Sequence, residues 1–147
     1  FGSLYGPRSN YRNGLYKIVY DYLKTKKISY FGSNKTMREY IHIKDAARSC
    51  VDILDKKFVN KVVVITGRQK IYVKKLLSVF SKLMGYGQKI YFKNIENPHH
   101  YERSPFSFSP KFGIRYFSKK NIALKNGLKE LIYVIKKENN LWLKQNI

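Results

Sequence analysis

The chain has 147 residues, of which 44% are hydrophobic, so it fits one domain with a buried core and is not a disordered basic tail. A single cysteine, Cys50, excludes a disulfide framework within one chain, and no apolar run approaches the roughly 20 residues of a membrane span, so we expect a cytoplasmic protein without membrane contact. The formal net charge of +21 points to an anionic partner, although the lysine pairs are scattered along the whole chain and mark no single binding element.

The N-terminal part of the chain is predicted as a strand, a helix and a second strand. Residues 1–4 read as a strand, which Gly6 and Pro7 break. Apolar side chains recur at helical spacing over residues 12–26 and predict a helix with one buried stripe, and a short strand is expected at residues 28–31. Because the sequence has no initiator Met and begins inside a strand-like run, we expect it to start partway through a larger protein.

Residues 37–47 combine an arginine, an alternating strand and an acidic helix start. From Arg38 onward, long polar side chains alternate with apolar or aromatic ones, which predicts a strand with two different faces. Asp45 falls at the change to helical period, where a carboxylate suits the N-terminus of a helix. A guanidinium beside a helix N-terminus can form an anion-binding corner. The alternative is a surface arginine on an ordinary strand-to-helix unit.

The remaining chain is predicted as alternating helices and strands. The helix expected over residues 44–55 has an inward stripe of Ala47, Cys50, Val51 and Leu54. The continuous β-branched run at residues 61–66 predicts a fully buried strand. Residues 94–110 hold three prolines and form a long irregular segment, of a length that is often functional. The other expected elements are helices over residues 72–84 and 122–137 and a strand over residues 88–93.

Five sequence blocks stand in a fixed order along the chain. They are Y-G-P-R at residues 5–8, I-S-Y-F-G at 28–32, R-E-Y-I-H-I-K-D-A-A at 38–47, V-I-T-G with the helix that follows at 64–80, and S-P-F-S-F-S-P-K with Gly127 and Leu128 near the end. Together they resemble the C-terminal half of the extended short-chain dehydrogenase/reductases, the NAD-dependent epimerase/dehydratase family that acts on nucleotide sugars. The resemblance implies an α/β fold (α+β as a fragment). Residues 1–147 would be the last parallel strands of a Rossmann sheet with a small mixed substrate-binding lobe, and the N-terminal Rossmann half would be missing.

The resemblance also implies an enzyme family with isomerase or oxidoreductase chemistry, whose products feed polysaccharide biosynthesis. The family's Gly-rich NAD turn and its catalytic Tyr-x-x-x-Lys pair find no match here, so we assign no catalytic residue and expect no stand-alone activity. The spacings Tyr20/Lys24 and Tyr22/Lys26 lie downstream of the Y-G-P-R turn and are interpreted as chance. NAD or NADP is expected in the parent enzyme, with none binding this chain alone.

The resemblance assigns the substrate-nucleotide side of the site to this chain. Arg38 matches the arginine that contacts the diphosphate of the nucleotide sugar, a role that suits a planar, permanently charged fork. Tyr40 matches an aromatic position beside the nucleotide, and a half-buried strand tyrosine is the alternative. Ser29 and Phe31 lie on the short strand that lines the base and ribose in relatives, and a core residue is the alternative for Phe31.

Five further positions follow from the resemblance. Ser3 stands where many relatives carry an asparagine that contacts the substrate, and Phe1 matches a residue whose backbone approaches the nicotinamide. Asn13, or Gly14 if the alignment slips by one, falls where relatives use asparagine against a phosphate. Arg103 falls near a second diphosphate arginine of the family, without the common R-P-G-D form. His42 and Asp45 are interpreted as structural, and the adjacent His99 and His100 as a chance loop pair and not a metal site.

The expected partners are a nucleotide-diphosphate sugar and either the missing Rossmann half or a second copy of the chain. One alternative function is a small basic nucleic-acid-binding protein, in which interleaved lysines and tyrosines contact phosphates and stack on bases. No recognised nucleic-acid motif accompanies the charge, so no specific nucleic acid is expected. A degenerate, non-functional remnant is the other alternative.

Overall fold

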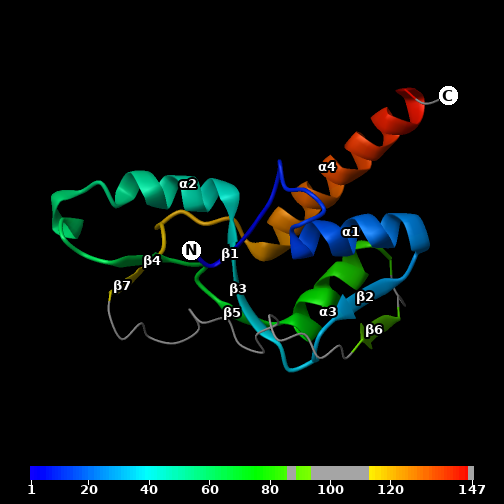
Figure 1. Ribbon diagram of the computed structural model, residues 1–147, viewed down its shortest axis with the longest axis horizontal. Coiled ribbons are helices and arrows are strands. Elements are labelled where there is room, and N and C mark those ends of the chain that lie inside the picture. Colours follow the sequence, from blue (N-terminus) through cyan, green and yellow to red (C-terminus); the bar gives the residue numbers. More distant parts are fainter. Residues whose placement is uncertain (86–88, 94–112, 146–147) are drawn as a thin grey trace.

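The computed structural model describes residues 1–85, 89–93 and 113–145 of the chain (Figure 1). The helices are α1 (Gly14–Thr25), α2 (Ile43–Asp52), α3 (Val73–Leu83) and α4 (Leu124–Gln145), with a 3-10 turn at Lys56–Phe58. The strands are β1 (Ser3–Tyr5), β2 (Ile28–Phe31), β3 (Met37–His42), β4 (Val63–Ile65), β5 (Lys70–Tyr72), β6 (Ile90–Lys93) and β7 (Ile114–Tyr116). The fold is mixed α/β, as predicted.

Strand β3 is the centre of the described sheet. It pairs in parallel with β1, which sets Ser3 opposite Tyr40, and antiparallel with β5 on its other edge. The pairs β2–β6 and β4–β7 are also parallel. The Gly2 N–H donates to the Ile65 carbonyl at 2.7 Å, which brings β4 beside the start of β1. A Cβ on Gly67 would overlap the Tyr40 carbonyl, so glycine is needed where the chain passes β3 this closely.

Two hydrophobic clusters lie beside β3. Figure 1 shows β1 and β3 running between α1, α3, α4 and β2 in one half of the molecule and α2, β4 and β7 in the other. The larger cluster takes side chains from β1, β2, α1, α3 and α4. The smaller cluster consists of Ile41, Ala46 and Ile65, with Ile53 and Val63 partly buried against it. Since each fully buried large apolar side chain contributes roughly 1.5–3 kcal/mol, most of the hydrophobic stabilisation comes from the larger cluster.

Helix α1 forms where the sequence predicts it. The Asn13 side chain caps its first turn, and Lys26 ends it in the left-handed conformation, with a φ of 57°. Its buried side chains recur at helical spacing and are Leu15, Ile18, Val19 and Tyr22.

Two predictions about burial are wrong. The inward face of α2 consists of Asp45, Ala46 and Ser49, and the residues predicted to point inward, Ala47, Cys50, Val51 and Leu54, are exposed. In the strand predicted to be fully buried, Ile65 is buried but Val62 is largely exposed, because β4 packs only on the smaller cluster. Strands β5 and β7 were not predicted, since each has three residues and neither lies in a continuous β-branched run like that of β4.

The described helices contain no segment that is both long enough and apolar enough to cross a membrane.

Candidate functional site

Strand β3 sorts its side chains into two rows. Arg38, Tyr40 and His42 share one face by the two-residue period of a strand. On this face Tyr5 packs edge-to-face against Tyr40 and His42, with ring centroids 6.2 Å and 5.2 Å apart. Glu39 and Ile41 point to the opposite face, where Ile41 joins the smaller cluster. The alternation predicted from the sequence therefore places Arg38 and Tyr40 together.

Arg38 is half-buried and lies close to two tyrosines. Its Nη1 donates to the Met37 carbonyl at 2.9 Å, which holds the guanidinium along the strand. Burial raises the pKa values of Tyr30 and Tyr40, and the positive charge of Arg38 acts on both in the opposite direction. The cation thus shares its surroundings with two aromatic side chains. Tyr30 was not among the predicted site residues, although the alternation in β2 would have placed it inward.

Phe31 and Ser29 lie on the other face of β2. Ile28 and Tyr30 are buried, whereas Phe31 is 36% exposed, so the interpretation of Phe31 as a core residue is wrong. The Phe31 ring centroid is 5.0 Å from Lys17 Nζ and 5.4 Å from Lys93 Nζ. The structure therefore places Phe31 in an exposed cationic setting and does not bring its ring to the face that Tyr30 shares with Arg38.

The N-terminal candidates lie around β1. Ser3 is half-buried and faces Tyr40 across the parallel pair, while Phe1 is 54% exposed. Asn13 Oδ1 accepts from the N–H groups of Leu15 and Tyr16, and its Nδ2 donates to the Leu4 carbonyl at 2.8 Å. Both ends of the Asn13 amide are thus engaged within the chain. Arg103 lies outside the described residues.

Two cavities border these residues. An open cavity of about 650 Å³ lies between the turn at residues 5–9 and the start of α2, and Asn13 is part of its wall. A smaller cavity of about 60 Å³ is lined by Tyr40 together with Gly67, Gln69 and Asn121. Arg38 lines neither cavity; it lies near Tyr30 and Tyr40, whose pKa values its positive charge lowers.

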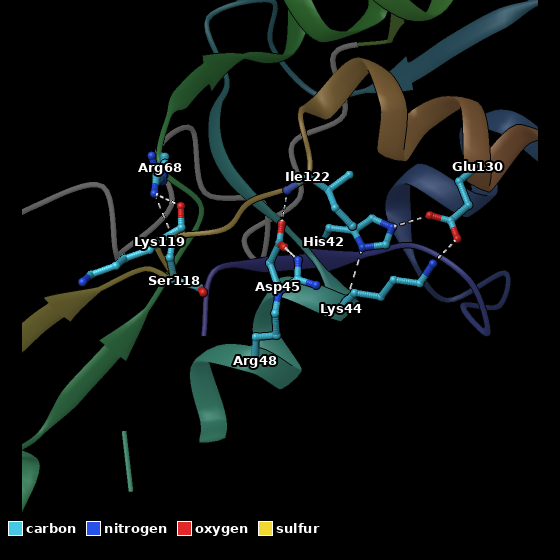
Figure 2. A network of polar contacts seen from close by, with 9 residues as sticks. All are labelled: His42, Lys44, Asp45, Arg48, Arg68, Ser118, Lys119, Ile122 and Glu130. Carbon is cyan, nitrogen blue, oxygen red and sulfur yellow. Dashed lines mark hydrogen bonds and ion pairs between the residues drawn. The ribbon is translucent and has the colours of Figure 1, made fainter. Parts of the chain in front are cut away.

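The start of α2 is tied to α4 by a polar network (Figure 2). His42 Nδ1 accepts from the Lys44 N–H at 3.3 Å, and His42 Nε2 lies 3.2 Å from Glu130 Oε2. Lys44 Nζ donates to the other Glu130 oxygen at 2.6 Å. Burial lowers the pKa of His42, and the hydrogen bond from Lys44 lowers the pKa of Glu130. These contacts support the structural interpretation of His42.

Asp45 joins the same network from inside the helix. Its Oδ2 accepts from the Ile122 N–H at 2.8 Å, and its Oδ1 pairs with Arg48 one turn later. Nearby, Arg68 Nη2 donates to the carbonyls of Ser118 and Lys119 (Figure 2). Over the described ranges, no three His, Cys, Asp or Glu side chains gather as metal ligands would. The network therefore fastens the segment before α4 to the start of α2.

A buried ion pair connects β3 to β7 on the opposite face. The Glu39 side chain is completely buried, and its Oε1 lies 3.2 Å from Arg115 Nη2. Arg115 also donates to the Thr66 hydroxyl and the Gly67 carbonyl, both at 2.9 Å. One guanidinium thus connects β3 with the end of β4. No sequence pattern predicts this ion pair, because Arg115 belongs to a strand that was not predicted.

The two Tyr-x-x-x-Lys spacings place each lysine over a ring face. Lys24 Nζ lies 4.5 Å from the Tyr20 ring centroid, and Lys26 Nζ lies 6.0 Å from that of Tyr22. Tyr22 is buried against Phe80 in the larger cluster. Tyr22 is thus a core residue, and the interpretation of both spacings as chance stays a prediction.

Comparison with known proteins gives one family match. Residues 1–66 match the sequence model of the NAD dependent epimerase/dehydratase family. A curated relative, the uncharacterized UDP-glucose epimerase YtcB of Bacillus subtilis, is 23% identical over 95 residues, which are 64% of this chain and 30% of the relative.

Several solved structures share the fold. The UDP-glucuronic acid 4-epimerase of Bacillus cereus, in complex with UDP-glucuronic acid and NAD, is 20% identical with a TM-score of 0.72, over 93% of this chain and 44% of that one. The dTDP-glucose 4,6-dehydratase of Bacillus anthracis, in complex with NAD, is 20% identical with a TM-score of 0.71, over 95% and 44%. The UDP-glucose 4-epimerase of Thermotoga maritima, with UDP-glucose, is 18% identical with a TM-score of 0.68, over 94% and 45%. The chain thus spans less than half the length of these proteins, and the predicted resemblance is confirmed.

Proposed function

We propose that this chain is the nucleotide-sugar-binding part of an NAD(P)-dependent epimerase, dehydratase or reductase, with Arg38 as its diphosphate contact. The observation that carries the proposal is the family match over residues 1–66, which includes β3 and every predicted substrate residue in the described ranges. The solved relatives named with UDP-glucuronic acid and UDP-glucose support a nucleotide-diphosphate sugar as the ligand class.

The chemistry of Arg38 suits a diphosphate. Its planar guanidinium can donate two parallel hydrogen bonds to phosphate oxygens, which an ammonium cannot. The backbone contact at Met37 restricts the side chain, so less entropy is lost when a ligand binds. Arg38 is half-buried near Tyr30 and Tyr40, and partial burial strengthens the attraction of its charge for an anion.

We expect this chain to lack a dinucleotide site of its own. The turn after β1 reads Gly6-Pro7-Arg8, and the sequence contains no G-x-G-x-x-G that could cradle a pyrophosphate. Phe1 remains the single proposed cofactor contact, through its backbone. The parent reaction, hydride transfer between the sugar and NAD or NADP, belongs to the proposal for the whole enzyme. From this chain we derive ligand binding and no catalytic step.

Isothermal titration with UDP-glucose and dTDP-glucose tests the proposal. We expect saturable binding of one of them by the wild type, and loss of that binding in Arg38→Ala. Arg12→Ala, which removes an exposed arginine from the turn before α1, is the matched control and should bind normally. No binding of either sugar nucleotide, combined with tight and sequence-preferring RNA binding, would favour the basic nucleic-acid-binding alternative. A chain without a cooperative unfolding transition would favour a degenerate remnant.

A further inference from the structure

A further cavity lies between the end of α2 and the segment that joins β7 to α4. It has a volume of about 620 Å³, which is in the range of small-molecule binding sites, roughly 300–1,000 Å³. None of the predicted substrate residues in the described ranges lines it. The cavity is therefore separate from the candidate site on β3.

Four cations and two carboxylates line this cavity, so its wall carries a net charge of +2. The cations are Arg48, Lys57, Lys119 and Lys120. Both carboxylates already have a partner. Asp52 Oδ2 accepts from the Tyr116 hydroxyl at 2.9 Å, and Asp55 Oδ2 accepts from Lys57 Nζ at 3.2 Å. The other three cations therefore supply the excess of positive charge.

These three cations have donors to spare. Lys119 and Lys120 are exposed, and in the part of the chain that the structure describes neither ammonium group has a hydrogen-bond or ion-pair partner. Arg48 pairs with Asp45 through Nη2, whereas its Nε is buried and has no hydrogen-bond partner among the described residues. A buried N–H without a partner is unusual and is satisfied when a ligand or water binds beside it.

The backbone that carries the two lysines is held in place. Arg68 Nη2 donates to the carbonyls of Ser118 and Lys119, and the Ile122 N–H donates to Asp45 (Figure 2). Figure 2 also shows the Lys119 side chain extending away from Arg68. Because the segment is fixed on both sides of the lysines, less conformational entropy is lost when they bind a ligand.

Part of the cavity wall is apolar. The Tyr116 ring packs edge-to-face against Phe58, with ring centroids 5.2 Å apart, and Val51 also lines the cavity. A small inorganic anion would leave these groups uncovered, so the cavity suits an anion with an organic body. A carboxylate has about four acceptor positions, and Asp52 and Asp55 therefore retain acceptors for hydroxyl groups.

We propose that this cavity binds a phosphate monoester of a small polyhydroxylated molecule, the chemistry of a sugar phosphate. A phosphate monoester carries a charge of about −1.5 to −2 at pH 7, which matches the net charge of the wall. Its oxygens accept hydrogen bonds from Arg48 and the two lysines, and its hydroxyl groups donate to the two carboxylates. This inference goes beyond the proposed function, because Arg38 takes no part in it.

NMR titration of the whole chain with glucose 6-phosphate tests the site. We expect saturable shifts of the amide signals of Tyr116 and residues 118–120. Glucose, which lacks the phosphate, should bind at least tenfold more weakly, and so should inorganic phosphate, which cannot cover the apolar wall. These two ligands separate recognition of the phosphate from recognition of the organic body.

Paired variants locate the binding. Lys119→Ala/Lys120→Ala should weaken binding of glucose 6-phosphate at least tenfold, because it removes two charge-assisted contacts. Lys136→Ala/Lys137→Ala removes the same charge from exposed positions of α4 and should leave binding within about twofold of the wild type. Arg38→Ala should also bind glucose 6-phosphate normally, even though we expect it to lose the nucleotide sugar.

Four results would overturn the site. They are no saturable binding of glucose 6-phosphate, inorganic phosphate binding as tightly as the sugar phosphate, equal weakening by both lysine pairs, and loss of binding in Arg38→Ala. Equal weakening would mean that the overall charge of the chain attracts the anion. Loss in Arg38→Ala would place the phosphate at the candidate site on β3. Binding that survives in Arg38→Ala keeps this inference independent of the proposed function.

Discussion

Helices α1 and α2 have the same kind of sequence and opposite surroundings. Each is amphipathic, each is capped at its N-terminus by a side chain, and each follows a strand of the same parallel pair. The apolar stripe of α1 is buried, and that of α2 is exposed. Periodicity therefore identifies an apolar stripe, whereas the direction in which the stripe faces depends on what lies next to the helix.

The surroundings explain the difference. Helix α1 lies beside α4 and β2 in the larger cluster, where its stripe meets other apolar side chains (Figure 1). Helix α2 contributes Ala46 to the smaller cluster, where it meets the buried Ile41 and Ile65, and polar contacts supply the rest of its attachment. One half of the molecule is thus held mainly by apolar packing, and the other mainly by hydrogen bonds and ion pairs.

The largest effect should come from placing the same charge in each stripe. Val19 is 1% exposed and Val51 is 68% exposed, so Val19→Asp and Val51→Asp form a matched pair. A buried, unpaired carboxylate costs a large part of the roughly 5–15 kcal/mol by which a domain is stable. We expect Val19→Asp to abolish cooperative thermal unfolding. Val51→Asp should stay within about 0.5 kcal/mol of the wild type, and a comparable loss in both would remove the contrast between the helices.

The next effect concerns the ion pair that holds the α2 side of β3. Arg115→Met leaves Glu39 buried without its cation, which should cost roughly 3–5 kcal/mol in urea denaturation. Adding Glu39→Gln removes the stranded charge and should recover much of that loss. If the double variant is no more stable than Arg115→Met, then the pair does not act as a unit.

Loss of the cap of α1 should have a smaller effect. Asn13→Ala removes two capping hydrogen bonds and the bond to Leu4, and we expect a loss of about 1 kcal/mol. Asn34→Ala, at an exposed loop position, is the control and should leave the unfolding midpoint unchanged.

Acidification should produce the smallest effect, on the attachment of α2. Burial lowers the pKa of His42 most strongly; Lys44 and Arg48 act in the same direction, and Glu130 and Asp45 oppose it. The folded chain therefore binds this proton less tightly than the unfolded chain. The stability contributed by neutral His42 is complete above the ordinary pKa of 6.5 and is lost as the pH falls below it.

Denaturation at pH 7.5 and pH 5.5 measures this dependence. The wild type should lose stability between the two values, and His42→Asn, which keeps a capping acceptor, should lose less. Glu130 contributes little to this change, because its pKa is already below the ordinary 4.5. An unchanged pH dependence in His42→Asn would exclude His42 as its source.

Much of the fold could be predicted from the sequence, because α1, α2, α3 and β3 have several residues with a clear period. The short strands β5 and β7 could not, since only their partners define them. The direction of the α2 stripe was predicted wrongly because the pattern cannot show whether Ile122 or an apolar neighbour lies beside the helix.

Only part of the predicted site consists of residues that are close together in the sequence. Arg38 and Tyr40 could be placed on one face because they lie two apart on one strand. Ser3 could not be set opposite Tyr40 without the register of the parallel pair. Tyr30 was missed because the family resemblance at residues 28–32 assigned the site to Ser29 and Phe31, which lie on the outer face of β2.

Two ligands that differ only in the diphosphate test whether Arg38 binds that group of a nucleotide sugar. Titrations of wild type and Arg38→Ala with UDP and uridine, or with dTDP and thymidine, can be followed by NMR. Loss of a charge-assisted contact worth roughly 1.5–3 kcal/mol should weaken binding of the diphosphate by about 10- to 150-fold and leave binding of the nucleoside unchanged. Equal losses for both ligands, or none for the diphosphate, would contradict the claim.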